Sequence, residues 1–221
     1  MSAPYDGLAD WYDENLADFT LAATDVLERL LGAGSGRCLD LCCGTGLHFS
    51  TLSRLGWIVT GIDISVDQLR LARERTDGTV ELVQGDATEL PFEDASYDAV
   101  VSMFTHTDVE DFAAVVREAT RVLRRGGAFV YAGLHPCFVG PHSRFVDAPG
   151  APALHPGYRK TRRYFQAPGI SPAGLRARVG AMHLPLEKLV GAFVDARLVL
   201  DHFGEHGEGD YPHRIALRAH R

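Results

Sequence analysis

Apolar residues in the first 134 positions follow two alternating patterns, helical spacing and short continuous runs. Residues 1–34 have helical spacing, which ends at Gly32 and Gly34. Strands that alternate with helices after this segment indicate a parallel sheet covered on both faces, with a ligand beyond the carboxyl ends of the strands. The apolar runs predict strands at 38–42, 57–62, 79–83, 97–103 and 128–134, and the helical spacing predicts helices at 47–55, 65–75 and 108–123.

Residues 135–178 break this rhythm. They hold seven of the eleven prolines and show no sustained periodicity. Aromatic residues such as Phe138 and Tyr158 nevertheless indicate that the segment buries side chains. A helix at 186–196 and strands at 198–203 and 213–219 close the chain. We therefore expect a Rossmann-like doubly wound α/β fold, mostly parallel with an antiparallel C-terminal edge strand. Its four parts are an N-terminal helical cap (1–34), a ligand-binding core (35–134), a lid-like insertion (135–178) and a C-terminal completion of the sheet (179–221).

Charge is divided unevenly along the 221 residues, whose net charge is −7. Residues 1–134 carry 10 basic and 22 acidic side chains, whereas 135–221 carry 12 basic and 7 acidic. Net acidity argues against a general nucleic-acid binder, because no broad basic face would neutralise phosphates. The first residues contain no basic side chain, and no apolar run reaches the roughly 18 residues of a membrane span. We expect a soluble, cytoplasmic protein without a targeting signal.

The four cysteines, Cys38, Cys42, Cys43 and Cys137, lack the paired spacing of a zinc site. Four histidines close to the C-terminus lie among glycines and share no helical face with a carboxylate. We therefore predict reduced thiols and no bound metal.

A glycine turn follows the first predicted strand. This part of the chain is a strand, turn, helix, strand unit that contains Asp40 and the turn at 44–46 and ends in the carboxylate of Asp63. Such an arrangement can hold a nucleoside. A dinucleotide site is excluded because Phe49 stands where its fingerprint requires a third glycine. A P-loop is excluded because no Lys-Ser or Lys-Thr follows the glycines.

Five motifs follow one another in register between residues 36 and 134. They are Leu39-Asp40-Leu41-Cys42-Cys43-Gly44-Thr45-Gly46, Gly61-Ile62-Asp63-Ile64-Ser65, Gly85-Asp86-Ala87 with Leu90-Pro91-Phe92, Tyr97-Asp98-Ala99-Val100 and Arg121-Val122-Leu123-Arg124-Arg125-Gly126-Gly127. Together they resemble the class I S-adenosylmethionine-dependent methyltransferases, specifically those of the small-molecule, type 11-like kind. One departure is Cys42, where the pattern of that family has glycine.

The resemblance implies that the core binds S-adenosyl-L-methionine and that the insertion covers the methyl acceptor. The 44–46 turn would hold the methionine end, Asp63 the ribose hydroxyls, Asp86 and Ala87 the adenine edge, and Ile64 the adenine face. The cofactor residues predicted in this way are Tyr5, Tyr12, Asp40, Cys42, Gly44, Gly46, Asp63, Ile64, Asp86, Ala87 and Met103.

Methyl transfer from a sulfonium is an in-line displacement, so the protein mainly positions the acceptor and excludes water. A base is required only for a weakly acidic acceptor, and imidazole is the natural base near neutral pH. His106 and His135 follow the fourth and fifth predicted strands, and His183 precedes the last helix. These three are the predicted catalytic residues, with His106 the first choice, although a surface or capping role is just as compatible with their positions.

Basic residues of the insertion, among them Arg159, Arg162 and Arg163, are interleaved with aromatic rings and indicate a flat, aromatic or anionic small-molecule acceptor. RNA is the runner-up substrate. Two other classes of protein stay open: a cyclase or isomerase of the same fold that keeps the cofactor as a structural element, and a regulatory subunit that only binds it. We expect a monomer or homodimer. The 20 arginines against 2 lysines indicate a bacterial gene of high GC content, and hence O- or N-methylation in secondary metabolism.

Overall fold

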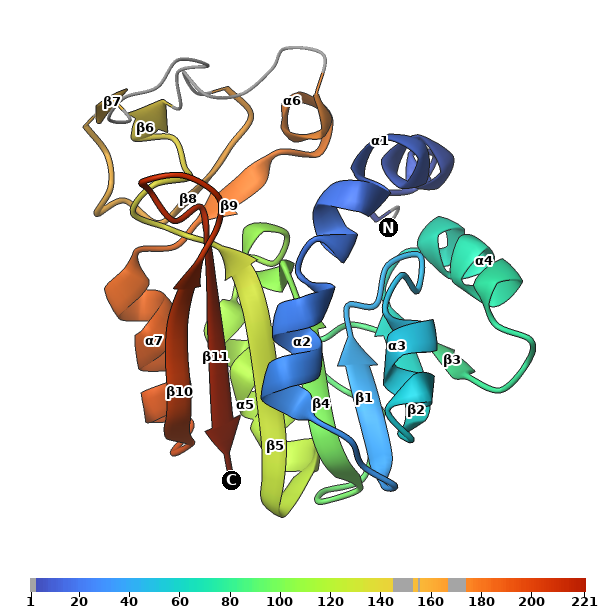
Figure 1. Ribbon diagram of the computed structural model, residues 1–221. Coiled ribbons are helices and arrows are strands. Elements are labelled where there is room, and N and C mark those ends of the chain that lie inside the picture. The colour runs from blue at the N-terminus through green and yellow to red at the C-terminus, as the bar shows by residue number, and fades with distance from the viewer. Residues whose placement is uncertain (1–2, 145–152, 155, 167–173) are drawn as a thin grey trace.

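A seven-stranded sheet runs through the centre of the computed structural model, which describes residues 3–144, 153–154, 156–166 and 174–221. The strand order is β10-β11-β5-β4-β1-β2-β3, and the first five strands of the chain are parallel (Figure 1). The prediction of a mostly parallel, Rossmann-like sheet is confirmed. The strands are β1 (Arg37–Leu41), β2 (Ile58–Asp63), β3 (Glu81–Gln84), β4 (Tyr97–Met103), β5 (Leu123–Leu134), β10 (Val199–His206) and β11 (Arg214–His220).

The C-terminal strand β11 is antiparallel to both of its neighbours, β5 and β10. It lies inside the sheet, and β10 forms the edge beside it. The antiparallel C-terminal strand that the sequence predicts is therefore present, one position in from the edge.

Helices cover both faces of the sheet. The helices α2 (Thr24–Leu31), α3 (Phe49–Arg54) and α4 (Val66–Arg75) contribute to the hydrophobic cluster on one face, and α5 (Phe112–Val122) and α7 (Leu186–Asp195) to the cluster on the other (Figure 1). Strand residues alternate between the two clusters, since Leu39 packs toward α5 and Cys38 toward α2.

Two helix starts follow from local capping. Ser65 Oγ accepts a hydrogen bond from the Gln68 backbone N–H at 3.2 Å, as the capping-box spacing predicts. The helix predicted at 108–123 begins only at Phe112, because the Asp111 side chain caps it through Ala114 N–H at 2.8 Å. Before it, a 3₁₀ turn, η1 (Thr105–Thr107), follows β4.

The predicted helix at 1–34 is two helices, α1 (Ala9–Leu21) and α2. The chain turns at Ala22 and Ala23 because α2 packs on the sheet, whereas α1 lies over the edge where the parallel strands end (Figure 1).

The insertion lies above the same edge (Figure 1). Its described elements are short, which explains why no periodicity reveals them, and residues 145–152, 155 and 167–173 of the predicted insertion lie outside the described residues. The elements are β6 (Ser143–Arg144) paired with β7 (Ala153–Leu154), β8 (Arg162–Tyr164) paired with β9 (Ala181–His183), and α6 (Leu175–Val179). Among the described residues, no helix combines the length and the hydrophobicity needed to cross a bilayer.

Phe49, which occupies the position of the third fingerprint glycine, fits because glycine stands at position 61. A Cβ at Gly61 would lie 2.6 Å from Phe49 Cζ and 3.0 Å from Cys43 Sγ. The helix α3 therefore packs on β2 through a ring, where a dinucleotide fold would use a bare glycine.

We predict that Gly61→Ala lowers the free energy of unfolding by about 1–3 kcal/mol, because the added methyl group overpacks the contact with Phe49. The matched control is Gly191→Ala in α7, where a Cβ would meet no atom within 4 Å. It should raise the free energy of unfolding by about 0.5–1 kcal/mol through helix propensity. Urea unfolding measures both, and equal effects of the two substitutions would contradict the packing described.

Candidate functional site

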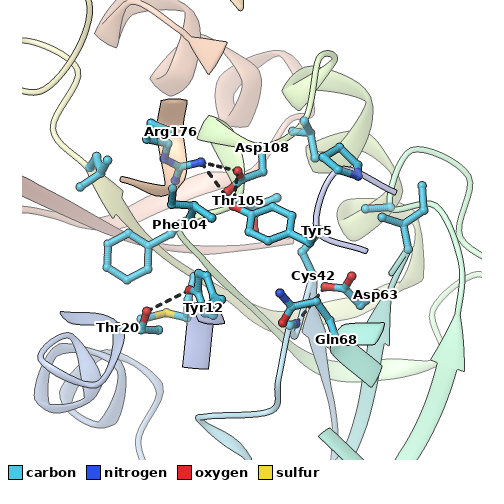
Figure 2. A pocket seen from close by; sticks show the side chains of 18 of the residues that line it. Tyr5, Tyr12, Thr20, Cys42, Asp63, Gln68, Phe104, Thr105, Asp108 and Arg176 are labelled. Atoms are coloured by element: carbon cyan, nitrogen blue, oxygen red, sulfur yellow. Dashed lines mark hydrogen bonds and ion pairs between the residues drawn. The ribbon is translucent and has the colours of Figure 1, made fainter. Parts of the chain in front are cut away.

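A cavity of about 700 Å³ opens over the carboxyl ends of β1, β2 and β4. Its walls come from the N-terminal cap, from the turns after these strands and after β3, and from the insertion. Figure 2 shows Asp63, Gln68 and Cys42 at one end of the cavity and Asp108 with Arg176 at the other. The position agrees with the rule that ligands of open α/β sheets bind where the strands end.

Nine of the eleven predicted cofactor residues line this cavity, although they come from five separate segments of the chain. They are Tyr5, Tyr12, Cys42, Gly44, Asp63, Ile64, Asp86, Ala87 and Met103.

The other two, Asp40 and Gly46, are not among the lining residues. Asp40 is 2% exposed within β1, and its Oδ2 atom has no hydrogen-bond partner among the described residues. Burial raises the pKa of Asp40 to about 7, and the charge of Asp63 adds to the effect. Gly46 has φ +74°, and a Cβ there would strike the Phe49 ring at 2.4 Å. Asp40 and Gly46 therefore support the glycine turn without lining the cavity.

Asp63 ties the glycine turn to the start of α4. Its Oδ2 atom accepts from Gly44 N–H and its Oδ1 atom from Ser65 N–H, both at 2.9 Å. Burial raises the pKa of Asp63, whereas these backbone hydrogen bonds act in the opposite direction. Each carboxylate oxygen can accept more than one hydrogen bond, so the cavity-lining Asp63 can still receive a diol.

Two lining residues have a left-handed backbone although neither is glycine. Cys42 has φ +59° directly after β1, and Phe104 has φ +63° directly after β4. Such conformations cost free energy and persist only where the surrounding structure imposes them, which is typical of ligand sites. Both turns bend sharply at the carboxyl edge and present their side chains to the cavity.

A partly buried ion pair closes the opposite end of the cavity. Asp108 Oδ1 accepts from Tyr5 Oη at 2.6 Å and from Arg176 Nη1 at 2.5 Å, and Arg176 Nη2 donates to Thr107 Oγ1 at 2.9 Å (Figure 2). Burial and the charge of Asp108 raise the pKa of Tyr5, so the phenol stays protonated. These contacts join the cap, the turn after β4 and α6 of the insertion.

The three histidines predicted as catalytic are not among the lining residues. His106 is buried between Phe112 and Tyr131, its Nδ1 atom bonds to Tyr131 Oη, and burial lowers its pKa to about 3. His135 bonds to Glu205 and to Cys137 N–H, and His183 Nε2 donates to the Tyr158 carbonyl at 2.6 Å. Because each is buried and turned away from the cavity, the structure does not place any of them as a base.

The predicted basic run of the insertion does not line the cavity either. Arg159, Arg162 and Arg163 are not lining residues. Arg163 donates to the carbonyls of Val179 and Asp108 and pairs with Glu110 at 3.6 Å. This arginine stabilises the insertion against the core and is not directed at a ligand.

Sequence reasoning missed several lining residues. Phe104, Thr105 and Asp108 follow β4, so the rule of strand carboxyl ends could have found them. Gln68 belongs to the first turn of α4, where its backbone N–H donates to Ser65 Oγ, and its side chain lines the cavity and is 3% exposed. Its Oε1 atom has no partner among the described residues, and a Cβ at Gly44 would lie 3.5 Å from it. Among the residues that the structure describes, no group of three or more histidine, cysteine or acidic side chains is placed to hold a metal ion.

Fold and site together define a Rossmann-like α/β domain with a cavity at the carboxyl edge of its sheet. The family model described as a methyltransferase domain matches residues 39–131. This match covers 93 of the 221 residues, so residues 39–131 are similar to methyltransferase domains, and the comparisons support S-adenosylmethionine as the cofactor.

Similar proteins support the same assignment. The demethylmenaquinone methyltransferase of Staphylococcus aureus is 43% identical over 99 residues, which are 42% of this chain and 41% of that protein. The chain thus matches about two fifths of the length of this curated relative. In fold it resembles an S-adenosylmethionine-dependent methyltransferase from Mesorhizobium loti (22% identity, TM-score 0.72, 98% of this chain and 99% of that chain). It also resembles the cyclase SpnF (20% identity, TM-score 0.62, 90% and 80%).

We predict that Asp40 makes stability depend on pH. Its pKa of about 7 lies above the ordinary 3.8, so the folded protein keeps a proton that the unfolded chain has lost between pH 4 and 7. The contribution of Asp40 to the free energy of unfolding is therefore highest below pH 4 and decreases as the pH rises to 7, by at most about 1.4 kcal/mol per pH unit. In urea unfolding, wild type should lose stability relative to Asp40→Asn over this range. Parallel pH profiles would contradict the prediction.

Proposed function

We propose that the protein is an S-adenosylmethionine-dependent methyltransferase that acts on a small-molecule acceptor. The observation that carries this proposal is that one cavity joins the Asp63 cradle to a second compartment between Phe104 and Arg176. A volume of about 700 Å³ lies in the upper part of the range of small-molecule sites, so it offers room for a cofactor and an acceptor side by side.

The residues of the cradle fit S-adenosylmethionine. Asp63 would accept the ribose hydroxyls, Asp86 and Ala87 would meet the adenine edge, and the half-exposed Ile64 would cover the adenine face. The unpartnered, buried oxygen of Gln68 faces the same space and supplies an acceptor for a polar hydrogen of the cofactor. Tyr5 and Tyr12, whose rings meet edge to face at 5.8 Å, close the cavity from the cap.

The bound cofactor supplies an electrophilic methyl group on a sulfonium. The protein then has to hold the acceptor atom in line and keep water out, and alignment alone accounts for roughly 7–11 kcal/mol of barrier reduction in well-oriented systems. No imidazole is among the described residues of the lining, so this mechanism has no histidine base. Such a site suits an O- or N-nucleophile that reacts without strong deprotonation, and we place the reaction in bacterial secondary metabolism.

We predict that Asp63→Asn weakens the binding of S-adenosylhomocysteine at least about tenfold, because a neutral amide replaces a charged acceptor of the ribose hydroxyls. The control is Asp77→Asn, an exposed carboxylate at the end of α4 that does not line the cavity, which should bind as wild type does. Isothermal titration calorimetry measures both. Unchanged affinity of Asp63→Asn would contradict the assignment of the cradle.

A second candidate function is ring closure or isomerisation with the cofactor kept as a structural element. The observation that favours it is the lack of an imidazole base among the described lining residues, together with the likeness in fold to a cyclase. Mass spectrometry after incubation with isotope-labelled S-adenosylmethionine and a panel of phenols, amines and carboxylic acids separates the two. A methyltransferase releases S-adenosylhomocysteine in step with a methylated product, and a cyclase releases none.

A further inference from the structure

The charges that line the cavity are mostly negative. Its described lining holds five carboxylates and a single guanidinium, that of Arg176. Asp63 and Asp86 belong to the cofactor cradle, so the remaining carboxylates and Arg176 belong to the acceptor compartment. These remaining carboxylates are Asp108, Glu110 and Asp111. Glu110 and Asp111 are exposed and pair with Arg163 at 3.6 Å and with Arg117 at 3.8 Å, so Asp108 is the carboxylate of the more enclosed part. An anion entering this compartment would still meet more negative than positive charge.

Arg176 is not available to compensate. Its Nη1 atom is bonded to Asp108 Oδ1, and its Nη2 atom donates to Thr107 Oγ1. The side chain is partly buried and held by the carboxylate, so the one cation of the described lining is already paired.

Asp108, in contrast, keeps capacity for a ligand. Its Oδ1 atom accepts from both Tyr5 and Arg176, whereas Oδ2 receives only a 3.2 Å contact from the Thr107 hydroxyl. That hydroxyl has one hydrogen and also approaches the Phe104 carbonyl at 2.9 Å. Oδ2 therefore retains acceptor sites on a residue that lines the cavity.

Apolar side chains form most of the remaining acceptor wall. They require an acceptor with an apolar body, because polar groups placed against these side chains would lose their hydrogen bonds to water and form no new ones. The wall contains Phe19, Phe104, Leu134, Val139 and Leu175.

We propose that the acceptor is a small molecule with an apolar body that carries no negative charge and presents an N–H or O–H donor to Asp108 Oδ2. Arg176 and Tyr5 are positioning residues that hold this carboxylate. The proposal rests on the proposed function, which it deepens by naming the class of acceptor, and it replaces the anionic acceptor that the basic run in the sequence indicates.

The test uses the full chain saturated with S-adenosylhomocysteine, so that the probes meet only the acceptor compartment. Three matched sets of probes, built on phenylethyl, naphthylethyl and octyl bodies, each contain an amine, an alcohol and a carboxylate. Calorimetry at neutral pH should show the amine or the alcohol binding at least about tenfold more tightly than the carboxylate of the same set. Equal or tighter binding of the carboxylates, or binding of no amine or alcohol in any set, would overturn the proposal.

Two variants with opposite effects sharpen the test. Asp108→Asn leaves the Arg176 cation uncompensated, so the amines should weaken and the carboxylates strengthen, which inverts the preference. Arg176→Gln leaves the Asp108 carboxylate without its cation, so the preference for amines over carboxylates should grow. This second variant keeps the test decisive if Asp108→Asn does not fold. The matched control is Asp94→Asn, which breaks an Asp–Arg pair with Arg121, formed at 2.8 Å between residues that do not line the cavity, and should keep the wild-type preference. Variants that leave the charge preference unchanged would refute the role of Asp108.

The binding of S-adenosylhomocysteine, measured first, separates the two levels of failure. If it does not bind, the proposed function fails. If it binds and the carboxylates are preferred, the proposed function stands and only the class of acceptor is wrong.

Discussion

The carboxyl ends of β1, β2, β3 and β4 meet at one edge of a parallel sheet, and the site depends on this constraint. Each strand delivers a turn to the same cavity, so residues from distant parts of the sequence become neighbours. The constraint has local costs. The chain must bend at once after β1 and β4, which places Cys42 and Phe104 in left-handed backbone, and the Asp63 carboxylate must be held by two backbone N–H groups.

The uneven charge of the chain also has a structural explanation. Basic residues of the C-terminal part pair with acidic residues of the core: Arg176 with Asp108, and Arg163 with Glu110. Arg178 lies 4.8 Å from the ring of Trp11 in α1, so the insertion also contacts the cap through a cation–π pair. The charge difference between the two parts therefore holds the insertion and the cap over the cavity. Arg159, Lys160 and Arg162, in contrast, are exposed and lie outside the cavity lining.

The sequence predicts the local features well and the long-range ones poorly. The parallel direction of β1 to β5 and the Ser65 cap follow from patterns in which a few neighbouring residues determine the backbone, and nine of the predicted cofactor residues line the cavity. Asp108 and Arg176 are 68 residues apart and share no spacing pattern, so no local rule could pair them. The orientation of His106 could not be predicted either, because a position close to β4 does not determine which way the ring points, and here the ring packs against Tyr131.

We propose that this cavity holds the cofactor with its nucleoside on Asp63. A crystal structure of the protein with S-adenosylhomocysteine tests it most directly. We expect ribose hydroxyls on the Asp63 carboxylate, adenine between Ile64 and the Asp86–Ala87 turn, and an unfilled acceptor compartment beside Asp108. A ligand bound outside this cavity, or bound with its ribose away from Asp63, would show that the cradle is assigned to the wrong residues.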